Sequence, residues 1–205
     1  HYEQSVRIVE VLEKDGKGLN LTWEVRDGIR NHRTSGHPST LEGAIVRLSD
    51  KIAYINHDID DAIRARMFTE EGLPAQYTDV LGKSVRERLN NMIHDMIENS
   101  MNRPEISMSE GMEEAMQGLR RWMFEHVYEN EIPKAEESRA QNMIAQLYEY
   151  YMSHVDKLPL EYVLLMVNRG EKKSRVVCDY IAGMSDIFAI DQFEELFVPK
   201  RWSIY

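Results

Sequence analysis

Residues 41–66 read LEGAIVRLSDKIAYINHDIDDAIRAR, and this stretch decides the fold. Its apolar residues recur every three or four positions, which is the spacing of one face of an α-helix. The apolar face carries Ile45, Leu48, Ile52, Ile55, Ile59 and Ile63. The opposite face carries a ridge of polar side chains, namely Asp50, Tyr54, His57, Asp58 and Asp61. The stretch therefore predicts one long helix with an apolar side and a polar side.

The helical period continues on both sides of this stretch, with turn residues between the periodic segments. We expect helical segments over about residues 6–12, 20–29, 41–67, 80–99, 107–128, 133–154, 159–169 and 174–197. No alternating pattern typical of a β-strand runs for more than a few residues. The sequence therefore predicts an all-α protein.

Composition excludes several classes of function. The 205 residues include 25 Lys and Arg against 35 Asp and Glu, and the net charge of -10 argues against non-specific binding of nucleic acids. A nucleoside triphosphate that arrives with a metal ion is still compatible with this charge. No apolar run approaches the roughly 18 residues that a membrane span needs, so we expect no membrane association.

The ends and the single cysteine point to the cytoplasm. The chain opens on polar residues without a signal peptide, and it lacks an initiator Met, so His1 is not expected to be the natural start. A lone Cys178 forms no internal disulfide, which fits a reducing compartment. Its neighbours Val176 and Val177 predict a buried and inert thiol.

The polar ridge of the long helix allows two interpretations. Charged stripes on helices are usually solvated faces, and spacing alone leaves that interpretation open. However, acidic residues repeated on one face repel each other, and only Arg47 and Lys51 are near enough to compensate. A carboxylate that binds a metal, together with a phenol and an ammonium that bind phosphate, would also give this pattern.

Three strings of the sequence resemble one known family. Residues 47–62, RLSDKIAYINHDIDDA, resemble the last motif of the dGTPase (dNTP triphosphohydrolase) branch of the HD-domain superfamily. Residues 1–5, HYEQS, resemble the H-x-E-Q-S motif of that family. Residues 179–186, DYIAGMSD, and 193–197, FEELF, resemble its C-terminal helix. The three strings occur in the family's order.

The resemblance implies a particular fold and division of the chain. It implies an HD-domain-like helical fold, of which this chain is the C-terminal portion with appended helices. Residues 1–70 would be the C-terminal part of the HD catalytic domain, and residues 71–205 a helical region that packs on it.

The resemblance also implies roles for individual residues. In the family, two His and two Asp hold a divalent metal such as Mg²⁺ or Mn²⁺, and Asp50 matches one of these four; the other three belong to sequence before His1. Lys51 and Tyr54 match positions that contact the triphosphate. Asp58 matches a residue that binds the deoxyribose 3'-hydroxyl or a nearby phosphate partner. His1 matches a catalytic histidine near the phosphates.

The reaction implied by the resemblance is hydrolysis of a deoxynucleoside triphosphate, dGTP by family habit, to a deoxynucleoside and intact triphosphate. Because most metal ligands are missing, we expect this chain alone to hold no metal and to be inactive. A homo-oligomer is expected, since family members commonly are oligomers. Two alternatives stay open. One is a helical oligomerisation or nucleotide-sensing module without turnover. The other is an HD phosphohydrolase acting on a monophosphate or a signalling nucleotide, although the pattern of Lys51, Tyr54 and Asp58 favours a triphosphate.

Overall fold

The computed structural model describes residues 1–128 and 131–200, and every regular element within these ranges is helical. The expected all-α class is therefore confirmed. The chain divides into two compact units, His1–Asn130 and Glu131–Tyr205. Within the described ranges, no helix is at once long enough and apolar enough for a bilayer crossing.

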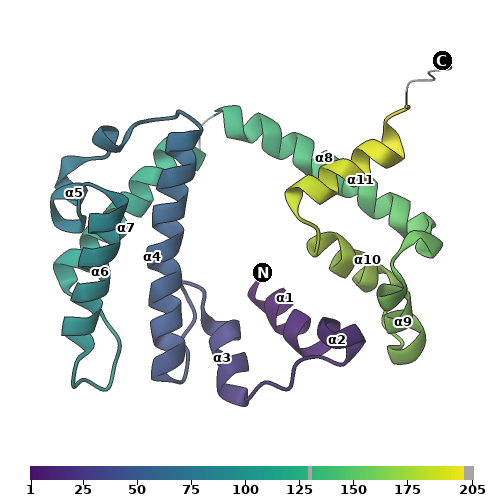
Figure 1. Cartoon of the computed structure of the whole chain (residues 1–205), viewed down its shortest axis with the longest axis horizontal. Coiled ribbons are helices and arrows are strands. Elements are labelled where there is room, and N and C mark those ends of the chain that lie inside the picture. Colours follow the sequence, from purple (N-terminus) through teal and green to yellow (C-terminus); the bar gives the residue numbers. More distant parts are fainter. Residues whose placement is uncertain (129–130, 201–205) are drawn as a thin grey trace. The chain divides into compact units, whose positions relative to one another are not determined.

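The first unit is organised around the long helix that the sequence predicts, α4 (Figure 1). Its elements are α1 (Tyr2–Arg7), the π-helix η1 (Ile8–Leu12), α2 (Glu13–Gly16), α3 (Trp23–Asn31), α4 (Leu41–Arg64), the 3-10 turn η2 (Glu70–Gly72), α5 (Ala75–Leu81), α6 (Val85–Ser100), α7 (Glu110–Met123) and the π-helix η3 (Phe124–Tyr128). Helix α4 packs against α3 and α6, and α5 packs against both α6 and α7. Thr40 begins α4 by accepting a hydrogen bond from the Gly43 amide.

The core of this unit uses the apolar face of α4. Leu48, Ile52, Ile55 and Ile59 are buried there, whereas Ile45 near the start of the helix is exposed. Facing them are buried side chains from α6 and α7, namely Met92, Met96, Ala115, Met116, Leu119 and Met123. Burial of this face leaves the opposite side of α4 available for a site.

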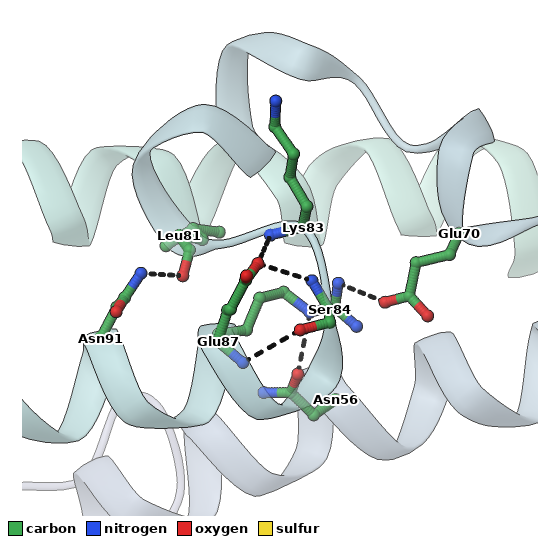
Figure 2. A network of polar contacts seen from close by, with 8 residues as sticks. Asn56, Glu70, Leu81, Lys83, Ser84, Glu87 and Asn91 are labelled. Atoms are coloured by element: carbon green, nitrogen blue, oxygen red, sulfur yellow. Dashed lines mark hydrogen bonds and ion pairs between the residues drawn. The ribbon is translucent and has the colours of Figure 1, made fainter.

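A helix predicted to begin at Val80 is wrong in its boundary, because the chain breaks at Gly82. Gly82 has φ +119°, a conformation that residues with a side chain rarely adopt, and it ends α5. Ser84 then begins α6 through a capping box. Its hydroxyl accepts from the Glu87 amide, and the Glu87 carboxylate accepts from the amides of Lys83 and Ser84 (Figure 2).

A fully buried arginine, Arg88, ties α6 to α4. Its Nε donates to Oδ1 of Asn56 at 3.0 Å, and its Nη1 lies 2.7 Å from a carboxylate oxygen of Glu70. Asn56, itself buried, donates in turn to the carbonyl of Ile52 at 2.8 Å. The partners Asn56 and Glu70 can be followed in Figure 2. A guanidinium out of water requires such pairing, so this contact fixes how the two helices sit.

Helices α5 and α7 approach closely at one glycine. A Cβ atom placed on Gly118 would overlap the ring of Tyr77, with its Cζ only 2.7 Å away. The absence of a side chain at position 118 thus lets the Tyr77 ring lie directly on the backbone of α7.

The second unit contains α8 (Glu131–Ser153), the 3-10 turn η4 (Val155–Lys157), α9 (Leu160–Arg169), α10 (Lys173–Ala182) and α11 (Asp186–Phe197). Helix α10 packs on α8 and α9, and α11 packs on α8. Its buried apolar side chains are Leu147, Tyr151, Leu158, Leu165, Val176, Val177 and Ala189.

Two predictions for this unit are corrected by the structure. The single helix expected over residues 174–197 is two helices, because the chain turns after Ala182 and Ser185 caps α11 through the Phe188 amide. Cys178 is exposed rather than buried. Val176 and Val177 point into the unit, and the helical rotation of about 100° per residue carries the next side chain outward.

The division predicted after residue 70 concerns family domains and stays a prediction. Along the sequence, the boundary between the two compact units lies elsewhere, between Asn130 and Glu131. Helices α5, α6 and α7 belong to the first unit because they form the core with α4.

Candidate functional site

The first unit contains a pocket of about 1040 Å³, a volume in the range of small-molecule sites. Three segments form its walls: the start of the chain with the loop after α3, the polar face of α4, and one face of α7 with the residue that follows it. The lining residues are His1, His32, Arg33, Thr34, Ser35, Asp50, Lys51, Tyr54, Ile55, Met116, Gln117, Arg120, Arg121 and Phe124.

The wall from α4 is part of the ridge that the sequence predicts. Asp50 is exposed, Tyr54 is 52% exposed, and Lys51 between them is half-buried. Burial lowers the pKa of the Lys51 ammonium, and the charges of Arg47 and Arg120 lower that pKa further, while Glu113 acts in the opposite direction. The pocket therefore holds Lys51 in surroundings that favour the arrival of an anion.

The wall from the N-terminal segment is held by contacts between α1 and the loop after α3. The rings of His1 and His32 pack edge to face with centroids 5.1 Å apart. The guanidinium of Arg33 lies 4.0 Å from the centre of the Tyr2 ring, a cation–π contact. The HYEQS string thus positions the loop residues that line the pocket.

Helix α4 also anchors this loop through Arg47. Its Nη2 donates to the carbonyl of Thr34 at 2.8 Å, and its Nε donates to the carbonyl of Arg33 at 3.4 Å. Arg47 is not among the pocket-lining residues, yet it fixes the backbone of two residues that are.

The wall from α7 follows from helix geometry. Met116, Gln117, Arg120, Arg121 and Phe124 recur at spacings of one and three, so they form one stripe along the helix. The adjacent stripe contains the buried Ala115, Leu119 and Met123, which fix α7 against the core. Phe124 begins the π-helix η3, and π-bulges inside helices are frequent at functional sites.

Of the five residues singled out from the sequence, the structure brings His1, Asp50, Lys51 and Tyr54 into one pocket. Asp58 lies one helical turn beyond Tyr54, is half-buried, and is not among the lining residues. The roles of all five stay predictions.

Sequence reasoning missed the residues that α7 and the loop contribute. His32, Arg120 and Arg121 line the pocket but were not among the candidate residues. No local signal marks them, because His32 reaches the pocket from the loop after α3, and Arg120 and Arg121 reach it from α7, far from α4 in the sequence.

The donor atoms of the pocket supply part of a metal site. Asp50 is the single carboxylate among the lining residues, beside the imidazoles of His1 and His32. Among the described residues, no group of three or more His, Cys, Asp or Glu side chains is arranged to hold a metal ion. The described residues therefore fit one ligand position of a divalent cation, that of Asp50, and not a complete site.

Comparison with known proteins first defines the class. Residues 106–195 match the family model of the phosphohydrolase-associated domain. This match begins just before α7 and covers both the α7 wall of the pocket and most of the second unit, so this part of the chain is similar to domains associated with phosphohydrolases.

Similar proteins then narrow this class. The chain is 52% identical over 202 residues to a deoxyguanosinetriphosphate triphosphohydrolase-like protein of Caldanaerobacter subterraneus subsp. tengcongensis, covering 98% of this chain and 59% of that protein. It is 38% and 39% identical to proteins with the same description from Clostridium perfringens and Clostridium tetani, covering 98% of this chain and 60% of each relative. The chain is thus similar, over nearly its whole length, to deoxyguanosinetriphosphate triphosphohydrolase-like proteins. It spans about 60% of the length of the relatives it matches.

Proposed function

We propose that the protein to which this chain belongs hydrolyses a deoxynucleoside triphosphate, with dGTP as the representative substrate, to a deoxynucleoside and inorganic triphosphate. The observation that carries the proposal is the convergence of His1, Asp50, Lys51 and Tyr54 on one pocket of suitable volume. The similarity of the chain to deoxyguanosinetriphosphate triphosphohydrolase-like proteins supports the same substrate class.

Each pocket residue has a chemistry that suits this reaction. Lys51 donates charge-assisted hydrogen bonds to phosphate oxygens, and the Tyr54 hydroxyl donates one more. His1, which lines the same pocket, is proposed to act as a proton donor or acceptor near the phosphates. Asp58, one turn beyond Tyr54, is proposed to bind the sugar hydroxyl.

A divalent cation such as Mg²⁺ or Mn²⁺, when bound, would neutralise part of the negative charge of the phosphates. Asp50 is the ligand that this chain offers to it, and the remaining ligands would come from residues outside the chain. We further propose that the working protein is a homo-oligomer in the cytoplasm.

The test is a chimera in which this chain replaces the matching segment of the Caldanaerobacter relative, since the chain covers 59% of that protein. With dGTP and Mn²⁺, the chimera is expected to release inorganic triphosphate, measured by ion chromatography. Its Asp50→Ala variant is expected to release none. Triphosphate release that is equally fast without Asp50 would refute the proposal.

The 205-residue chain by itself serves as the second arm. We expect no turnover, because one carboxylate leaves a divalent cation bound mostly by water. Rapid release of triphosphate by this chain alone would show that the metal site has been placed wrongly. Nucleotide binding by the chimera without any turnover would instead favour the sensing module.

A further inference from the structure

The pocket reverses the charge balance of the chain. Overall, acidic residues outnumber Lys and Arg by 35 to 25. The lining residues include four cationic side chains, Arg33, Lys51, Arg120 and Arg121, against the single carboxylate of Asp50. A local excess of positive charge in an acidic protein attracts anions to that place.

Two of these cations come from separate helices. Arg120 of α7 and Lys51 of α4 line the same pocket, so an anion bound there can contact both. Within the described part of the chain, neither side chain forms an ion pair or a side-chain hydrogen bond. A polyanion bound in the pocket would be attracted by both side chains at once.

The position of Arg120 is fixed by the fold. The residue before it, Leu119, is fully buried, and Met116, one turn earlier on the same stripe, is also in the core. The backbone position from which the Arg120 side chain extends is therefore fixed by the packing of α7. An arginine on a fixed backbone is suited to phosphate because its planar group can donate two parallel hydrogen bonds.

We propose that Arg120 is a phosphate-binding residue and that α7 and α4 hold the triphosphate between Arg120 and Lys51. This proposal rests on the proposed function, since it assigns a further residue to the same nucleotide site. It gives α7 a direct part in substrate binding beyond its contribution to the core.

The experiment measures binding of inorganic triphosphate to the 205-residue chain by isothermal titration calorimetry at low ionic strength. The chain is compared with Arg120→Ala, Arg120→Lys and Lys51→Ala variants. Arg86→Ala is the matched control, because Arg86 is an exposed arginine on α6 of the same unit and does not line the pocket. Far-UV circular dichroism melting checks that each variant is folded, including Lys51→Ala, whose side chain is half-buried.

We expect Arg120→Ala and Lys51→Ala each to weaken triphosphate binding roughly 10- to 150-fold, the loss of a charge-assisted hydrogen bond. Arg120→Lys should retain part of the affinity, and Arg86→Ala should change it less than about twofold. This pattern would establish Arg120 as a phosphate-binding residue.

Three other results overturn the proposal in distinguishable ways. If only Lys51→Ala weakens binding, Arg120 is a solvated charge and the proposed function stands. If neither variant weakens binding, or if the unaltered chain does not bind triphosphate, Arg120 and Lys51 do not form an anion site in this chain and the proposal fails. Release of triphosphate by the chimera then decides the proposed function separately. If Arg86→Ala weakens binding as much as Arg120→Ala, the attraction is a general effect of charge.

Discussion

Lys51 shows how a single side chain in this pocket is prepared for its ligand. Burial and the neighbouring charges of Arg47 and Arg120 disfavour the charged ammonium and lower its pKa. A phosphate group placed beside Lys51 reverses that balance, because an anion favours the charged form. The affinity of the pocket for phosphate should therefore be highest while Lys51 is protonated, and it should fall at alkaline pH, as Lys51 loses its proton.

Substitutions along the polar face of α4 separate the predicted roles. In the chimera, Asp50→Ala should abolish both bound metal and turnover. Lys51→Ala and Tyr54→Phe should leave the metal content unchanged and lower kcat/KM by roughly 10- to 150-fold, because each removes one hydrogen bond to phosphate. Metal content by mass spectrometry and steady-state rates, measured on the same preparations, provide the comparison.

His57→Ala is the internal control for this series. His57 is exposed on the ridge but does not line the pocket. Its substitution should therefore change metal content and kcat/KM less than any of the other substitutions. Loss of metal in His57→Ala together with its retention in Asp50→Ala would show that the His57-Asp58 pair is the true metal position.

For single residues, the sequence predicted correctly which side chains lie together when all of them belong to one helix. Asp50, Lys51 and Tyr54 share a face of α4, so their spacing alone places them together. Arg33 and Arg120 reach the same pocket from other segments, and the local sequence carries no record of that packing. For Cys178, two buried neighbours suggested burial, but the helical rotation turns the thiol outward.

Among the elements, α6 depends on its capping box. Ser84→Ala removes the hydrogen bond from the Glu87 amide to the Ser84 hydroxyl and leaves that amide without its cap. We expect the free energy of unfolding to fall by about 1 kcal/mol, measured by urea denaturation. Ser49→Ala, at an exposed position inside α4, should leave stability unchanged or slightly higher, since alanine is the better helix former. An equal loss in both variants would mean that the cap contributes nothing specific.

The helix boundaries show which signals of the sequence were strong. The 24 residues of α4 were predicted because a long, regular period has few alternatives. The breaks at Gly82 and Gly183 were missed because apolar residues continue at helical spacing across both. The Ser84-Val85-Arg86-Glu87 string does carry a capping-box pattern, and it marks the start of α6 correctly.

Two tyrosines in the helices of the second unit should make this unit less stable at alkaline pH. Burial raises the pKa of Tyr162 above its ordinary value of 10.0, and the nearby carboxylates of Glu161 and Asp179 raise it further. Burial also raises the pKa of Tyr151, whose hydroxyl donates to Oε1 of Gln192 at 2.9 Å. A raised pKa of a phenol means that folding favours its neutral form.

Below the ordinary tyrosine pKa these phenols contribute fully to the free energy of unfolding. That contribution is lost as the pH rises through their higher pKa values in the folded state. Unfolding measured in urea should therefore show lower stability at pH 11 than at pH 8. Tyr162→Phe should reduce this difference, because the variant has no phenol to ionise at that position. An unchanged difference in Tyr162→Phe would contradict the assignment of Tyr162 to this effect.

On the scale of the whole molecule, the two compact units have separate sets of buried side chains. Leu119 is fully buried in the first unit and Leu147 in the second. Each Leu→Ala change should cost about 2–5 kcal/mol. In the double variant the two losses should add within about 0.5 kcal/mol, because each leucine packs inside its own unit. Urea unfolding of the four proteins gives the coupling free energy, and a value well above 1 kcal/mol would show that the two cores depend on each other.

The close approach at Gly118 has a consequence for the history of the family. Any side chain at position 118 would collide with the ring at position 77, so neither position can vary alone without cost. Across an alignment of relatives, the two columns should therefore covary: a residue larger than glycine at 118 should occur with a smaller residue in place of the Tyr77 ring. Independent variation of the two columns would indicate that evolution has moved α5 relative to α7 instead.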